Sequence, residues 1–294
     1  ITVGVWALIT VLSVMNGFER ELRERILSVA SHATVSARSG WLDDWPALTE
    51  SIAEHPEVLA TAPFIYGQGL LTRANTVSGA LIRGVLPERE AAVSTILQHL
   101  IAGDRNPLSK GDWKIVLGAQ LARSLGVGVG DRVTLIAPKG RITPAGLLPR
   151  MRRFEVSAIF EMNMYEYDSG RALIHLDDAA QLLETEGGVS GVRISLQEIY
   201  RAPLVRAQLQ ERLGGAFHIS DWTREHENFF TALKIERRVM FVILMLIIAV
   251  AAFNIVSTLV MVVTDKRADV AILRTLGLAP LHVMVVFIVQ GIVI

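Results

Sequence analysis

The feature that most constrains the fold is an uncharged stretch at residues 239–263, which Arg238 precedes and Asp265 follows. As a helix that rises about 1.5 Å per residue, it would reach roughly 37 Å, and the hydrocarbon of a bilayer is about 30 Å thick. A buried helix of a soluble protein is the alternative, but such helices seldom run so far without a charge. We therefore expect residues 239–263 to span a membrane.

Two further apolar stretches, residues 1–18 and 281–294, lie at the two ends of the chain. Each stops with its apolar pattern unbroken, and position 1 is Ile rather than Met. We interpret them as parts of a first and a third spanning helix, and the chain as a fragment of a longer protein. The N-terminal stretch could instead belong to a signal peptide, but it has neither a basic leader nor an obvious small-residue cleavage site before Glu19.

The loop at residues 264–280 indicates the orientation, because it carries Lys266, Arg267 and Arg274 against two aspartates. Short loops rich in Lys and Arg stay on the cytoplasmic side of a membrane. Residues 19–236 would then lie on the other side.

Residues 19–236 have the pattern of a globular α+β domain. Paired strands are expected at residues 64–72 and 76–85, and a compact strand–helix–strand module at about 111–160 is expected to be inserted into a discontinuous larger domain. Further strands are expected at residues 32–37, 172–175, 191–196 and 217–219, and helices at 41–54, 88–102, 177–184 and 202–213. From residue 223 a charged helix should run directly into the span.

Composition excludes several function classes. The net charge is zero and no run of Lys and Arg occurs, which argues against a nucleic-acid surface. The chain has no Cys, and its seven His are scattered without the spacing of a metal site. No phosphate-binding G-x-x-x-x-G-K-[ST] motif occurs, so we expect no ATP hydrolysis, no metal and no cofactor in this chain.

The segment at residues 138–150 should protrude from the domain. Pro144 and Pro149 stiffen it, and Ile142, Leu147 and Leu148 supply apolar side chains that would attract a partner. The alternative is an ordinary hairpin whose apolar residues fold back on the module.

Three motifs together resemble the LolC and LolE permeases of the bacterial lipoprotein-releasing ABC transporter, in the group that includes MacB and FtsX. They are SVMNGFEREL at residues 13–22, AAFNIVSTL at 251–259 and DKRADVAILRTLG at 265–277. The resemblance covers the whole chain. It implies a multi-pass protein of the bacterial inner membrane with four spans, the last of them missing here, and a large periplasmic domain after the first.

The resemblance also implies partners: a LolD-like ATPase subunit that binds ATP and Mg, a second permease subunit or a copy of this chain, the periplasmic carrier LolA, and lipoprotein substrates in membrane lipid. It implies four sets of site residues. The carrier-binding hook would be Ile142, Thr143, Pro144, Ala145, Gly146, Leu147, Leu148 and Pro149, with a pad at Arg152 and Arg153. The ATPase-coupling helix would comprise Lys266, Arg267, Asp269, Ile272, Leu273, Arg274, Leu276 and Gly277. Candidates for a lipoprotein gate are Met15, Phe18, Leu22 and Asn254.

Alternatives stay open at this point. The coupling helix could be an ordinary interfacial helix that joins two spans, and packing alone explains the gate pattern. The hook favours LolC, whereas Trp41, Trp45 and residues 62–65 and 255–260 look equally like LolE, so a combined form is a further alternative. A MacB-like exporter or an FtsX-like transducer shares the topology without the hook. A periplasmic sensor fits less well, because the chain returns to apolar sequence at residue 281.

Overall fold

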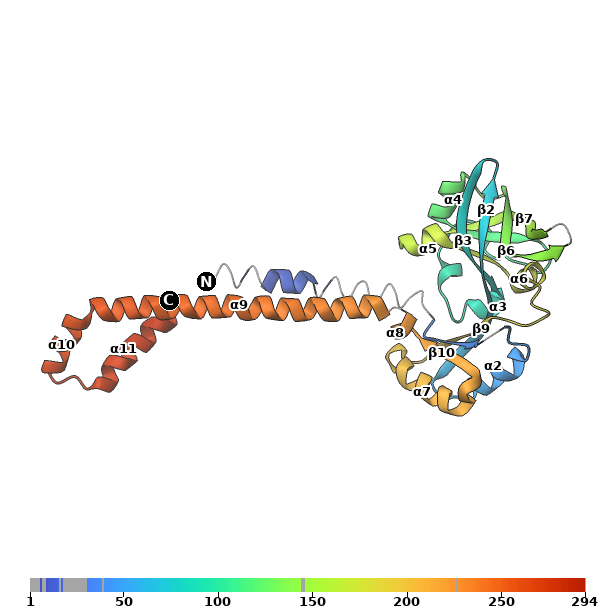
Figure 1. The fold of residues 1–294 in the computed structure, drawn as a ribbon. Coiled ribbons are helices and arrows are strands. Elements are labelled where there is room, and N and C mark those ends of the chain that lie inside the picture. Colours follow the sequence, from blue (N-terminus) through green and yellow to red (C-terminus); the bar gives the residue numbers. More distant parts are fainter. Residues whose placement is uncertain are drawn as a thin grey trace. The chain divides into compact units, whose positions relative to one another are not determined.

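The structure is a computed structural model that describes residues 6, 9–15, 17, 31–38, 40–143, 146–225 and 227–293 (Figure 1). The chain forms two compact units. One comprises Ile1–Met15 with Glu227–Ile294, and the other comprises Asn16–His226.

One half of the unit Asn16–His226 is an antiparallel sheet with the strand order β10-β1-β9-β2. These strands are β10 (Phe217–Asp221), β1 (Ala33–Ala37), β9 (Gly191–Leu196) and the first part of β2 (Val58–Arg73). Helix α7 (Ala202–Leu213) packs against β10, and α2 (Trp45–Ala53) packs against β2 and β9. Both helices carry a proline in their first turn, where its fixed φ favours helix initiation.

The long strand β2 continues into the second half, which is a closed barrel. Its strands follow one another around the ring as β2–β3–β8–β5–β7–β6 and back to β2. The ring strands other than β2 are β3 (Thr76–Val85), β5 (Lys114–Gly118), β6 (Arg132–Thr143), β7 (Gly146–Phe160) and β8 (Arg171–His175). Leu71, Leu135 and Phe154 are at most 1% exposed and belong to its core. Closure removes the free strand edges that an open sheet would present.

The contact that closes this barrel is the pairing of β2 with β6 through Leu71 and Leu135. Gly69 makes it possible. A Cβ at position 69 would lie 2.8 Å from Leu135 Cδ1 and 2.9 Å from the carbonyl oxygen of Ile136. Only glycine leaves room for the two strands to approach this closely.

Helices cover parts of the barrel. Helix α4 (Ala119–Leu125) packs against α5 (Tyr165–Gly170), and α6 (Leu176–Leu183) packs against β3 and β8. The remaining short elements are α3 (Pro87–Glu90), β4 (Leu100–Gly103), α8 (Trp222–Glu225) and the 3-10 turns Ile96–Gln98, Ile199–Arg201 and Gly214–Ala216.

The structure confirms the paired strands expected at residues 64–72 and 76–85, which are β2 and β3. The helix expected at residues 88–102 is wrong: α3 ends at Glu90, and β4 pairs with the edge of β7 instead. Strand pairing over a long sequence separation outweighs the local helical pattern there. The helix expected from residue 41 begins at Trp45, because Leu42 forms a bridge with Val189.

Residues 111–160, expected to form an inserted module, contribute β5, α4, β6 and β7 to the barrel. The other ring strands, β2, β3 and β8, come from outside this range. The barrel core therefore draws on three separate parts of the sequence.

The second unit contains α9 (Glu227–Asp265), α10 (Arg267–Thr275) and α11 (Pro280–Val293), and residues 9–15 are also helical. The part of α9 at Thr231–Asp265 is the one helix in the described residues that is long and apolar enough to cross a membrane, and its apolar window is not buried. It includes residues 239–263. A shorter apolar helix lies at Pro280–Val289. His226, which separates α8 from α9, lies outside the described residues.

Candidate functional site

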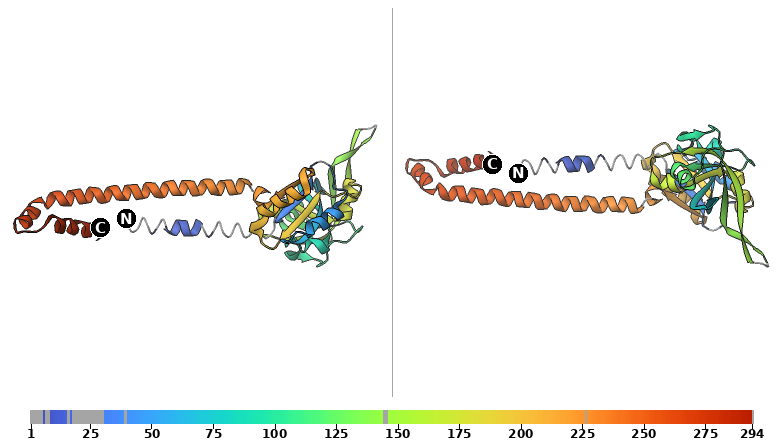
Figure 2. Two further views of the ribbon diagram at one scale, coloured as in Figure 1. Left: turned by 90° about the horizontal axis from the view of Figure 1, so that it is seen from below. Right: turned by 90° about the horizontal axis from the view of Figure 1, so that it is seen from above.

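The segment at residues 138–150 forms the far end of a β-hairpin. Strands β6 and β7 pair antiparallel from Arg132↔Glu155 to Thr143↔Gly146. Figure 2 shows this hairpin extending beyond the barrel. Pro144 and Ala145, at the expected tip of the hook, lie outside the described residues. The backbone of Ile142, Thr143, Gly146, Leu147 and Leu148 belongs to the paired strands.

A bulge separates the end of the hairpin from its base. Ala137 pairs with Arg150, but the next pair is Arg141↔Leu148, so Pro138, Lys139 and Gly140 lie opposite Pro149 alone. Proline has no N–H to donate, so the ladder is interrupted where the two prolines meet. A bulge of this kind bends the strand and increases its twist.

The base of the hairpin is fixed firmly in the domain. Val133 pairs with Phe154, and both side chains are 1% exposed in the barrel core. On β7, Arg150 forms an ion pair with Glu184 and donates a hydrogen bond of 3.4 Å to the carbonyl oxygen of Leu182. The far end therefore extends from a rigid support.

Arg152 and Arg153, the pad residues, are exposed on β7 beside this base. The Cζ atom of Arg152 lies 4.0 Å from the centroid of the Trp113 ring. With Thr134 and Met151, these residues line a pocket of about 490 Å³. The site thus combines two cations with an aromatic ring and an exposed Met.

Trp113 is a site residue that sequence reasoning missed. Its ring packs edge-on against Phe154, with the centroids 5.5 Å apart. The buried carboxylate of Asp178 accepts hydrogen bonds from the N–H groups of Gly111 (2.8 Å) and Trp113 (3.2 Å). Burial raises the pKa of Asp178, and these hydrogen bonds oppose the shift. The sequence showed only that a tryptophan directly precedes a predicted strand. It did not indicate that Arg152 would lie beside the ring.

An apolar groove lies next to the hairpin base and was also missed. Leu70, Leu81, Ile136 and Pro138 line this cavity of about 590 Å³ together with three glycines. Leu70 is 47% exposed, although it lies in the middle of a barrel strand. An exposed apolar groove of this kind favours contact with another apolar surface.

The segment expected to be the coupling helix forms the helix α10, which begins at Arg267. Lys266 Nζ lies 2.9 Å from Asp269 Oδ2, and Arg274 is in the last turn. The apolar residues of the helix are exposed: Ile272 by 59%, Leu273 by 46% and Leu276 by 79%.

Gly277 ends α10, as expected, with φ +96°. Its N–H donates to the carbonyl of Arg274, and the N–H of Leu278 donates to the carbonyl of Leu273. These two bonds form a Schellman motif, which requires the left-handed conformation that glycine adopts readily.

The structure describes two of the four gate candidates, Asn254 and Met15. Asn254 is exposed on α9, where its carbonyl accepts a hydrogen bond of 2.9 Å from Thr258. Met15 is half-buried in the helical residues 9–15. Phe18 and Leu22 lie outside the described residues. Within the described part of the chain, no group of three or more His, Asp and Glu residues could hold a metal ion.

Comparison with known proteins gives consistent matches. The model of the MacB-like periplasmic core domain family matches residues 1–212. The lipoprotein-releasing system transmembrane protein LolC of Xylella fastidiosa is 44% identical over 99% of this chain and 70% of its own length. LolE of Haemophilus influenzae is 30% identical over 99% of this chain and 71% of its own length. The periplasmic region of MacB from Actinobacillus actinomycetemcomitans aligns with a TM-score of 0.45 at 13% identity, over 70% of this chain and 94% of that structure.

Proposed function

This chain belongs to the family of the lipoprotein-releasing system transmembrane proteins LolC and LolE, and from that premise we propose that it is a permease subunit that releases lipoproteins from the bacterial inner membrane. Identity to LolC relatives over nearly the whole chain supports this proposal. The family is one of ABC transporter permeases, whose members act by moving a substrate rather than by transforming it.

The energy would come from outside this chain. In the proposed assembly, a LolD-like ATPase subunit holds ATP and Mg, and a second permease subunit or a copy of this chain completes the transporter. Exposed apolar side chains support an ATPase contact at α10: Ile272 on the helix is 59% exposed, and Leu276 at its C-cap is 79% exposed.

Acyl chains explain why a carrier is needed. Each buried CH₂ group of a lipid anchor contributes about 0.8 kcal/mol, so moving a triacylated anchor into water costs tens of kcal/mol. A receiver with an apolar interior, held close to the permease, avoids most of this cost. We assign that receiver as the periplasmic carrier LolA.

The observation that carries this assignment is the β6–β7 hairpin. Its base is fixed in the barrel core by Val133 and Phe154, and its far end has the apolar sequence of residues 142–148. Arg152 on Trp113, at the base, supplies a cationic surface for the same partner. This arrangement favours the LolC-like role of carrier capture.

The test replaces Ile142, Leu147 and Leu148 together with Ser in the full chain. The carrier pulled down by the variant should fall at least about tenfold, the effect of losing roughly 1.4 kcal/mol, while membrane insertion persists. The matched control replaces the exposed apolar residues Leu59 and Val77 with Ser. Unchanged carrier capture by the triple variant would refute the hook. Capture by a transporter assembled from this permease alone would indicate a combined LolC and LolE role.

A further inference from the structure

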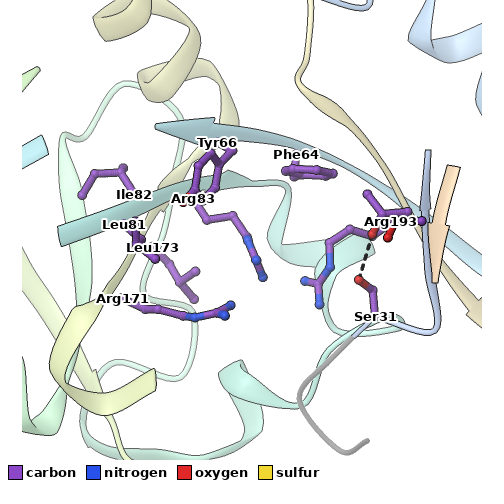
Figure 3. Close-up of a pocket in the computed structure, with 11 residues that line it drawn as sticks. Ser31, Phe64, Tyr66, Leu81, Ile82, Arg83, Arg171, Leu173 and Arg193 are labelled. Atoms are coloured by element: carbon purple, nitrogen blue, oxygen red, sulfur yellow. Dashed lines mark hydrogen bonds between the residues drawn. The ribbon is translucent and has the colours of Figure 1, made fainter. Parts of the chain in front are cut away.

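A third cavity, of about 320 Å³, lies within the unit Asn16–His226 and away from the hairpin. Figure 3 shows the guanidinium groups of Arg83 on β3, Arg171 on β8 and Arg193 on β9 directed toward one space. Among the described residues that line it, there is no aspartate or glutamate. Three cations from three strands are therefore concentrated around one small volume.

Each of the three arginines is held in place by a contact within the domain. The Cζ atom of Arg171 lies 3.8 Å from the centroid of the Tyr167 ring, and that of Arg83 lies 6.0 Å from the centroid of Phe64. Stacking on a ring orients a guanidinium without neutralising it. Arg193, 2% exposed, is fixed by an ion pair with the fully buried Glu90.

The positive charge of Arg193 is felt by its surroundings. The pKa of His32 is lowered, first by burial and additionally by the charge of Arg193. The pair with Glu90 offsets part of the Arg193 charge, so Arg83 and Arg171 are the main cations of the cavity.

Hydroxyl groups line the same cavity, together with apolar and aromatic side chains. Ser31, Thr34 and Ser220 contribute to the wall, and Ser31 Oγ lies 3.1 Å from Thr34 Oγ1. Guanidinium forks and hydroxyls together supply the donors that a phosphate group accepts, and the fork geometry matches paired phosphate oxygens. The volume suits a small headgroup rather than a folded partner.

We propose that this cavity binds a phosphate-bearing anion, either free phosphate or the headgroup of an anionic phospholipid. Ala33 and Asp221 are register partners at the start of β1 and the end of β10, and the nearby Ser31 and Ser220 line the cavity. The proposal does not depend on carrier capture by the hairpin.

The experiment titrates the full chain in detergent with two probes, inorganic phosphate and soluble dihexanoylphosphatidic acid, against chloride at equal ionic strength. Saturable binding of phosphate would identify a free-oxyanion site, and binding of the lipid probe alone would identify a headgroup site. Arg83→Gln and Arg171→Gln should each weaken binding about tenfold, as expected for lost hydrogen bonds to a charged group. Arg105→Gln, which removes an exposed cation elsewhere, should leave binding unchanged.

Arg193 is left intact in this test because Glu90 would lose its buried partner. A second measurement needs no variant. Whichever of the two probes binds, phosphate or dihexanoylphosphatidic acid, should slow the modification of Arg83 and Arg171 by phenylglyoxal in the unmodified protein. It should not slow the modification of Arg105. Mass spectrometry locates the modified residues. If neither probe binds, or if both arginines react at the same rate with and without ligand, the proposal is overturned.

Discussion

The guanidinium of Arg152 stacks on the indole of Trp113 at a distance of 4.0 Å, and this pair joins two strands of the barrel at the base of the projecting hairpin. Trp113 precedes β5, and Arg152 lies on β7. The indole is itself supported by Phe154 below and by the turn that Asp178 holds. The position of the exposed Arg152 guanidinium therefore depends on the buried carboxylate of Asp178 on α6.

Replacing Trp113 with Ala should weaken carrier capture several-fold, because an exposed cation–π contact contributes about 0.5–1 kcal/mol and orients Arg152. Trp113→Phe keeps a ring and should retain most of the affinity. The dissociation constant for the immobilised carrier checks both variants. Capture by the Ala variant at the affinity of the unmodified protein would show that the stack has no part in the pad.

Replacing Asp178 with Ala should lower the free energy of unfolding by about 1–3 kcal/mol, since the N–H groups of Gly111 and Trp113 lose their acceptor. Asp177→Ala is the matched control. Its carboxylate pairs with the exposed Lys110, and exposed pairs contribute little. Thermal unfolding of the full chain compares the two variants. Equal shifts for both would contradict the role given to Asp178.

Local sequence patterns predicted the elements whose side chains alternate cleanly, such as β3 and β9, and the helix α10 with its stop at Gly277. The closure of the barrel was not predictable in this way. It depends on β2 meeting β6, far apart in the sequence, and on a missing side chain at Gly69. The stack of Arg152 on Trp113 depends on the parallel pairing of β5 with β7. Local sequence pattern does not show which strands are neighbours, so the pad was predicted without Trp113.

Gly69→Val should therefore open the barrel where β2 meets β6. The added side chain would clash with the carbonyl of Ile136, and overpacking of this kind costs about 1–3 kcal/mol. Hydrogen exchange at residues 134–136 should accelerate along with the loss of stability. Gly79→Val, on the neighbouring strand β3, is the control, because a Cβ there meets open space. Equal exchange in the two variants would count against closure by this pairing.

Gly277→Ala should destabilise the end of α10 by about 1 kcal/mol, because the Schellman motif places this residue at φ +96°. Asn tolerates the left-handed conformation better, so Gly277→Asn should be milder. If α10 contacts the ATPase subunit, co-purification of that subunit should weaken in the order Gly, Asn, Ala. If the unmodified protein and both variants retain the ATPase subunit equally, the C-terminal end of α10 has no part in the ATPase contact.

The last prediction concerns pH. His32 Nδ1 accepts a hydrogen bond of 2.8 Å from the N–H of Leu196, which joins the segment before β1 to the end of β9. Burial lowers the pKa of His32, and the positive charge of Arg193 adds to this effect.

Because the folded state disfavours the protonated ring, its contribution to stability is complete above the unfolded pKa of about 6.5 and is lost as pH falls through the lower folded pKa. The melting temperature should therefore drop between pH 7 and pH 5. His32→Asn supplies an amide oxygen for the same N–H and should remove this part of the decline, whereas His218→Asn, at an exposed position on β10, should keep it. An identical decline in the His32→Asn variant would mean that another group controls the acid sensitivity.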